Sequence, residues 1–166
     1  KIANLLNAEN HGKTLLQQMH LEIDEIQKND KISTPLDVVL VVEAFTSQRS
    51  SIFIAQNNAY LAQLVKICGA NPIAWGKNNW KEIDMELLIR LNPTVIIHFA
   101  KSSDKPEDVL KIWKKNLPML QAAEKNNIIV LNDESLTQPG SQVANSLRSI
   151  CKSLRGQRAI ADENVK

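Results

Sequence analysis

The sequence predicts an α/β protein, a three-layer sandwich with a mostly parallel sheet that is preceded by a long helix. Three short, continuous, apolar runs, at 37–43, 95–99 and 127–131, are typical of strands buried on both faces of a parallel sheet. Amphipathic helical patterns separate these runs, so strands and helices alternate along the chain. The length of 166 residues fits roughly one domain.

The first helical pattern extends from the first residue to about Lys28. Its apolar residues recur at spacings of three and four, and they include Leu15, Leu16, Met19 and Ile26. No N-capping residue precedes Ile2, so we expect the helix to begin upstream of Lys1. At ~1.5 Å per residue this helix is about 40 Å long, which is more than one small domain needs.

The first strand is predicted at 37–43. A polar loop at 47–51 and a short apolar stretch at 52–54 follow it. We expect a helix over 57–68, because its apolar residues share one face and Gly69 lies at the position that often ends a helix.

Three further helices are expected between and after the remaining strands. Asp84 can cap a helix that runs through Leu91. The segment 104–107 has the spacing of a capping box and opens a helix to about Lys114. The last helix is predicted over 143–154, and the polar segment 156–166 is expected to be a frayed tail.

Composition excludes several classes of protein. Hydrophobic residues make up 43 % and charged residues 23 %, which is ordinary for a globular protein. A net charge of +2 gives no argument for nucleic acid as a partner, and no apolar run has the ~18 residues of a membrane span. The chain starts at Lys1 without Met or a signal peptide.

Motifs for catalysis are absent from the sequence. It contains no glycine-rich nucleotide loop, no nucleophile elbow and no His-Glu-x-x-His motif. His11 and His20 lie nine residues apart, which does not suit paired metal ligands on a helix. His98 ends a strand, where a structural role is the simpler interpretation, and Asp104 and Asp108 fit helix capping and dipole neutralisation. We therefore predict no catalytic residues, no metal ligands and no enzymatic activity.

The cysteines and tryptophans leave alternatives open. Cys68 and Cys151 are either two buried thiols or a disulfide, which requires an oxidising compartment. Trp80 follows a polar run and precedes a helix, so we expect it in a loop, either as an exposed anchor for a large ligand or as a packing residue. Phe53 is ambiguous in the same way, whereas Trp75 and Trp113 are interpreted as packing residues.

A series of short motifs follows the first helix and first strand. They read Phe53-Ile-Ala-Gln-Asn-Asn-Ala-Tyr-Leu, Leu64-Val-Lys-Ile-Cys-Gly-Ala-Asn-Pro-Ile, Trp80-Lys-Glu-Ile-Asp-Met-Glu-Leu-Leu, Leu91-Asn-Pro-Thr-Val-Ile-Ile, Leu117-Pro-Met-Leu-Gln-Ala-Ala-Glu-Lys-Asn-Asn-Ile-Ile-Val-Leu and Gln138-Pro-Gly-Ser-Gln. In this order, over about residues 1 to 155, the series resembles the C-terminal lobe and connecting helix of class III substrate-binding proteins of ABC importers. These helical-backbone proteins bind cobalamin, haem and ferric siderophores.

Within that family, the branch that binds cobalamin (vitamin B12) is the most similar. The resemblance implies a disulfide between Cys68 and Cys151. It also implies that Phe53, Trp80 and Asp133 line the ligand cleft, with Asn57 or Asn58 as further polar contacts. Glu86 matches the acidic knob that docks on an arginine pocket of the membrane permease, a pairing that a charge-assisted hydrogen bond would strengthen.

One departure from the family bears on the ligand. The family commonly has Arg-Pro-Gly-Pro-Arg where this chain has Gln138-Pro-Gly-Ser-Gln142. The two missing arginines would pair with an anionic ligand such as haem or a carboxylate siderophore, so their loss favours the amide-rich cobalamin. Neither Tyr60, within a helix, nor His98, within a strand, makes a convincing axial ligand for haem.

Together these features predict a substrate-binding protein of a periplasmic or extracytoplasmic compartment. We expect residues 1–30 to form an inter-lobe helix and 36–155 a C-terminal lobe, with the N-terminal lobe missing from this chain. The protein would capture cobalamin, with no cofactor of its own, and deliver it to an inner-membrane ABC permease. Full length, it would be a monomer, with a lipid anchor as one option. The alternatives are a haem or ferric-siderophore binder, a doubly wound α/β enzyme, or an interaction module without a small ligand.

Overall fold

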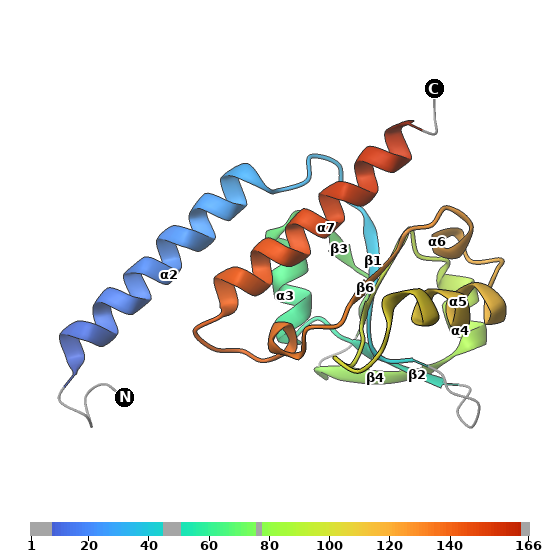
Figure 1. Ribbon diagram of the computed structural model, residues 1–166, viewed down its shortest axis with the longest axis horizontal. Coiled ribbons are helices and arrows are strands. Elements are labelled where there is room, and N and C mark those ends of the chain that lie inside the picture. Colours follow the sequence, from blue (N-terminus) through green and yellow to red (C-terminus); the bar gives the residue numbers. More distant parts are fainter. Residues whose placement is uncertain (1–7, 45–50, 76–77, 164–166) are drawn as a thin grey trace.

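Helices and strands alternate along most of the chain, as Figure 1 shows. The computed structural model describes residues 8–44, 51–75 and 78–163. The helices are α2 (Glu9–Asn29), α3 (Tyr60–Ile67), α4 (Met85–Leu91), α5 (Pro106–Asn116), α6 (Gln121–Glu124), the 3-10 helix η1 (Glu134–Thr137) and α7 (Val143–Glu163). The strands are β1 (Asp37–Glu43), β2 (Ser51–Ala55), β3 (Asn71–Pro72), β4 (Trp80–Asp84), β5 (Val95–Phe99) and β6 (Ile128–Leu131).

These strands form one sheet in the order β4-β2-β1-β5-β6, with β3 also paired to β1. The pairs β1–β3, β1–β5 and β5–β6 are parallel, whereas β1–β2 and β2–β4 are antiparallel. Parallel pairs are therefore in the majority within the described part of the chain, as the sequence predicts. The parallel strands β1, β5 and β6 end at the same edge of the sheet.

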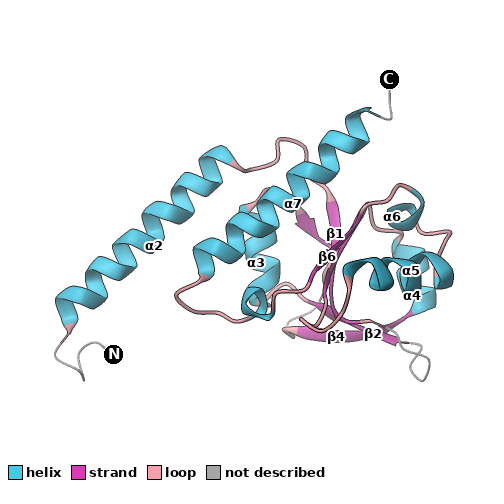
Figure 2. Ribbon diagram, viewed as in Figure 1, coloured by secondary structure: helices cyan, strands magenta, loops and turns pink. Residues whose placement is uncertain are grey.

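Helices cover both faces of this sheet and make the expected three layers (Figure 2). Along β1, Val38 and Leu40 face a core that α2, α3 and α7 supply. Val39 and Val41 face a second core that α4, α5 and α6 supply. The continuous apolar run of β1 thus reflects a strand that is buried on both sides.

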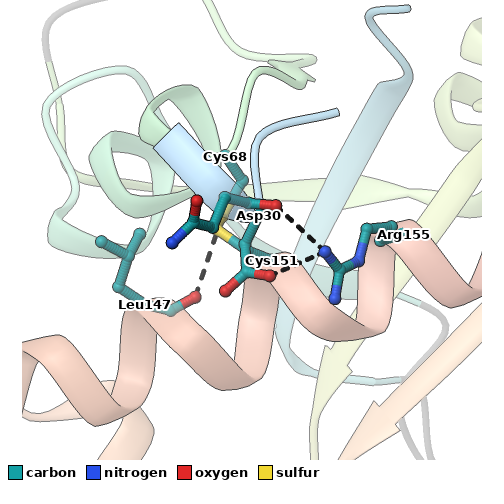
Figure 3. A network of polar contacts seen from close by, with 6 residues as sticks. Asp30, Cys68, Leu147, Cys151 and Arg155 are labelled. Atoms are coloured by element: carbon teal, nitrogen blue, oxygen red, sulfur yellow. Dashed lines mark hydrogen bonds and ion pairs between the residues drawn. A yellow bond between two sulfur atoms is a disulfide. The ribbon is translucent and has the colours of Figure 1, made fainter. Parts of the chain in front are cut away.

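Helix α2 leads away from the sheet, and only its C-terminal end is packed tightly (Figure 1). Ile26 is its buried residue, and the helix contacts α7. At this end Arg155 of α7 forms an ion pair with Asp30 at 2.8 Å and donates to the carbonyl of Asn29 at 3.1 Å (Figure 3). The expected start of the helix, upstream of Lys1, lies outside the described residues.

Local end signals account for two of the expected helix boundaries. The Asp84 side chain accepts a hydrogen bond from the Leu87 N–H at 2.7 Å, so Asp84 caps α4 as predicted. Gly69 follows the end of α3 with φ +89°, and a Cβ at this position would lie 2.8 Å from the carbonyl oxygen of Ile32. Glycine is required there by both conformation and space.

Three other expectations about helix ends are wrong. Helix α3 begins at Tyr60 rather than near Asn57. The side chain of Asp104 accepts from the Lys101 N–H at 3.1 Å, so the N-cap of α5 is Lys105 and no capping box forms. Helix α7 continues to Glu163, past the predicted end near Leu154 and through most of the segment expected to be frayed.

A disulfide joins Cys68, at the end of α3, to Cys151 in α7 (Figure 3). Both cysteines are fully buried in the core between the sheet and helices α2, α3 and α7. The bond links positions 83 residues apart, with the Cα atoms 5.1 Å from each other. The pairing that the family resemblance implies is confirmed.

Replacement of both cysteines, C68A/C151A, is expected to lower the free energy of unfolding by about 2–4 kcal/mol, because the unfolded chain loses a long covalent loop. Urea unfolding of the two oxidised proteins measures the difference. As a control, thiol titration of the unreduced, denatured wild-type chain should find neither cysteine free. Two reactive thiols in that titration would contradict the disulfide.

Candidate functional site

A hollow of about 920 Å³ lies where strands β1 and β5 end. The end of β1, the end of β5, the β5–α5 loop and the first two turns of α5 line it: Val42, Glu43, Ala44, His98, Phe99, Ala100, Lys101, Ser103, Asp104, Lys105, Asp108, Val109, Ile112 and Trp113. The carboxyl edge of a parallel sheet is where α/β proteins place ligands, and this volume suits a small-molecule site.

Hydrogen bonds hold the β5–α5 loop, which forms one wall of the hollow. The Glu134 carboxylate accepts from the Ser102 N–H at 3.3 Å and from the Ser102 hydroxyl at 2.9 Å. Asn132 donates to the Asp104 carbonyl at 3.4 Å. The segment after β6 therefore fixes the loop after β5, so the wall is formed before any ligand arrives.

His98 and Trp113 form a buried polar pair in the lining. The indole Nε1–H of Trp113 donates to His98 Nδ1 at 3.0 Å, and the two rings meet edge to face with 6.0 Å between centroids. Burial lowers the pKa of His98 from 6.5 to about 4, although the nearby Asp104 charge opposes this shift. The imidazole is consequently neutral at pH 7. Its buried hydrogen bond to Trp113 agrees with the structural role that the sequence suggests for His98.

The predicted aromatic residues lie on the β2–β4 part of the sheet. Trp80 is the first residue of β4, so the expectation of a loop is wrong. It pairs with Ala55, and Phe53 pairs with Glu82, so Phe53 and Trp80 share one face as diagonal neighbours. Trp80 is 44 % exposed. This exposure would allow its indole to contact a ligand.

The predicted asparagines lie between β2 and α3. Asn57 donates to the Ala74 carbonyl at 3.3 Å and accepts from Lys66 Nζ at 3.2 Å. One N–H and one lone pair of the Asn57 amide are thus used in local structure, and Asn58 is exposed.

Asp133 is exposed and caps the short helix η1. Its carboxylate accepts from the N–H of Ser135 at 2.9 Å and from the hydroxyl of Ser135 at 2.6 Å. These hydrogen bonds lower the pKa of Asp133, so the carboxylate stays ionised. The neighbouring Glu134, which the sequence analysis did not single out, is the residue that reaches the wall of the hollow.

Glu86 lies in the exposed first turn of α4. Its carboxylate is at the end of the helix where negative charge is favourable.

The predicted ligand residues and the hollow do not coincide. Phe53, Asn57, Asn58, Trp80 and Asp133 are all described by the structure, and none of them lines the hollow. Phe53 pairs across strands with Glu43, one of the lining residues. Most lining residues belong to no recognisable sequence motif. The position of His98 at the end of a predicted strand was a signal that could have pointed to this site. In the described chain no cluster of three or more His, Cys, Asp or Glu side chains could hold a metal ion.

Comparison with protein families gives one match. A family model described as "Periplasmic binding protein" matches residues 1–135 of the chain. No curated protein matches the sequence significantly. Among the described helices, none combines the length and the apolar character that crossing a membrane requires.

Solved structures share the fold at low sequence identity. A possible iron-binding, periplasmic solute-binding protein from Staphylococcus epidermidis has a TM-score of 0.80 and 18 % identity, and the match covers 92 % of this chain and 58 % of that one. The periplasmic haem-binding protein RhuT from Roseiflexus sp. RS-1 has a TM-score of 0.77 and 20 % identity, and the match covers 94 % of this chain and 60 % of that one. The periplasmic vitamin B12-binding protein BtuF of Vibrio cholerae has a TM-score of 0.63 and 15 % identity, and the match covers 92 % of this chain and 54 % of that one. The chain thus spans little more than half the length of these proteins, which differ in their ligands.

The buried neutral imidazole predicts a pH-dependent stability. Well above pH 6.5 His98 is neutral in both states, and between pH 6.5 and about 4 it is mainly the unfolded state that carries the proton. The free energy of unfolding should therefore fall as the pH drops through this window, by up to about 3 kcal/mol from His98 alone. Urea unfolding at several pH values measures this.

H98Q should have a shallower slope of stability against pH than the wild type over the same window. H20Q, at an exposed histidine of α2, is the matched control and should keep the wild-type slope. Equal slopes for H98Q and the wild type would contradict a depressed pKa at His98.

Proposed function

The chain belongs to the periplasmic binding protein family, and on this premise we propose that it is one lobe of an extracytoplasmic substrate-binding protein of an ABC importer. The observation that carries the proposal is the family match over residues 1–135. The hollow at the carboxyl ends of β1 and β5 is consistent with it, since it offers this lobe a preformed surface for a ligand. In this role the protein binds and releases its ligand unchanged and is not an enzyme.

The proposed mechanism is capture of a large ligand between this lobe and a second one. Helix α2 is suited to join them, because most of its length leads away from the sheet (Figure 1). Leu15, Leu16 and Leu21 of this helix are 43 %, 56 % and 68 % exposed on different sides of it, and a second lobe would cover at least one of these sides. A rigid helix between lobes would permit only small hinge movements.

We propose cobalamin as the ligand. Phe53 and Trp80 share one face of the β2–β4 pair and would supply flat apolar contact, with Asp133 and Asn57 or Asn58 as polar contacts. Gln138 and Gln142 are exposed and uncharged at the positions of the family's two arginines, which favours an amide-rich ligand over an anionic one.

Haem or a ferric siderophore is the competing ligand class. Proteins of the same fold include haem-binding and Fe³⁺-hydroxamate transport proteins, so the shared fold is compatible with each of these ligands. Absorbance titrations of the full-length chain with cyanocobalamin, haemin and a ferric hydroxamate would distinguish them. Preferential binding of haemin would overturn the choice of cobalamin.

W80A is expected to weaken cyanocobalamin binding by about tenfold or more, because an exposed indole that stacks on the ligand loses its contact area. Titration calorimetry on the full-length chain measures the affinity. M119A is the matched control, since Met119 is another exposed apolar residue, 60 % exposed and outside the proposed site. Unchanged affinity in W80A would remove Trp80 from the site.

E86A is expected to leave ligand affinity unchanged and to reduce transport, because Glu86 is proposed to pair with arginines of the permease. Uptake into proteoliposomes that contain the permease measures the effect at low and high salt. E107A removes another exposed carboxylate, from the first turn of α5, and should transport normally. Full transport by E86A would place the docking surface elsewhere.

A further inference from the structure

The hollow has a hydrogen-bonding group in its lining that the proposed contacts leave unused. His98 lines it and is itself 7 % exposed. One ring nitrogen, Nδ1, is turned toward Trp113 and accepts its indole N–H at 3.0 Å. Nε2 lies on the opposite edge of the ring, away from this bond.

The bond from Trp113 also fixes where the proton of the imidazole resides. An indole nitrogen can only donate, so Nδ1 must be the unprotonated, accepting nitrogen. Burial lowers the pKa of His98 to about 4, so the neutral ring carries its proton on Nε2 at pH 7. A protonated Nε2 can donate a hydrogen bond, but it has no lone pair in the ring plane for a metal ion.

Charges around His98 do not make the hollow an anion site. The described lining carries Lys101 and Lys105, but also the carboxylates of Glu43, Asp104 and Asp108. The first turn of α5 holds acidic residues that offset the positive end of the helix. An uncharged acceptor suits this setting better than a carboxylate.

We propose that His98 is a specificity-determining contact, whose Nε2–H donates a hydrogen bond to an uncharged acceptor oxygen on the ligand, such as a peripheral amide carbonyl. The histidine does not coordinate the metal of a chelate. Trp113 is the positioning residue that holds the ring in the donating tautomer. This inference rests on the proposed function, because it needs a chelate to enter the hollow.

Nitrogen NMR of the histidine ring in the full-length ¹⁵N-labelled chain tests the tautomer without any ligand. At pH 7 the spectrum should show an unprotonated Nδ1 and a protonated Nε2, and cyanocobalamin should shift the Nε2–H resonance. A proton on Nδ1, or no shift at saturating cyanocobalamin, would overturn the proposal. W113F should loosen the tautomer preference, whereas W75F should not.

Affinity measurements separate this inference from the function on which it rests. H98L should bind cyanocobalamin about tenfold more weakly, and H98Q, which retains an amide donor, should recover part of that loss. H20L, at an exposed histidine of α2, is the control and should bind as the wild type does. A cooperatively folded H98L with wild-type affinity would overturn the role of His98 alone.

Two other outcomes count against the proposals in different ways. A full-length wild-type protein, with both lobes, that binds neither cyanocobalamin nor haemin in absorbance titrations would overturn the proposed function and the role of His98 with it. The haemin complex of the wild type could show the spectrum of iron–imidazole ligation, and H98Q could lose it. This result would overturn only the statement that His98 donates a hydrogen bond and does not coordinate the metal.

Discussion

The parallel pairing of β1 with β5 is the constraint on which the rest of the structure depends. In register, Val38 to Val41 lie beside Val95 to His98, and both strands are covered on both faces. A strand in this position has no face left for water, so nearly every residue along it must be apolar. The helices follow from that demand, because each face of the sheet has to be covered by an apolar helix surface. The disulfide then joins two of the covering helices on one face.

The same constraint explains why the polar groups gather at one edge. Within β1 and β5 the backbone is satisfied by its neighbours, but the chain must turn away from the sheet beyond Glu43 and Phe99. Polar side chains occur at the strand ends, with His98 just before Phe99, and those that are buried need partners. His98 is bonded by Trp113, and Ser102 is bonded by Glu134. Polar side chains at this edge can therefore contact a ligand, and hydrogen bonds hold them in place.

Sequence reasoning succeeded where the signal was local or carried by burial on both faces. It placed β5 at its observed bounds, because a doubly buried strand is a continuous apolar run, and it placed the cap at Asp84 and the glycine at Gly69. It missed β4 because this strand is mostly exposed, with Ile83 as its buried residue, so no alternation marks it. No capping box forms at Asp104, because its carboxylate accepts from the Lys101 N–H and α5 begins one residue later, with Lys105 as its N-cap. Competition of this kind is decided by backbone geometry that residue spacing does not specify.

The candidate site was the hardest part to predict because it is assembled from segments that are far apart in the chain. The family resemblance pointed to residues of β2, β4 and the η1 segment, whereas the hollow is lined from β1, β5 and α5. Phe53 pairs with Glu43, but it shares a face with Ala55 of the core under α2, α3 and α7. His98 pairs with Val41 of the opposite core, so the two sets lie largely on opposite faces of the sheet. Fold similarity cannot choose among ligands here, since the strand framework that creates the edge is shared by proteins with different ligands. In our proposal, side chains at the edge make this choice: a proton held on Nε2 of His98 would favour an oxygen acceptor on the ligand over coordination of a metal ion.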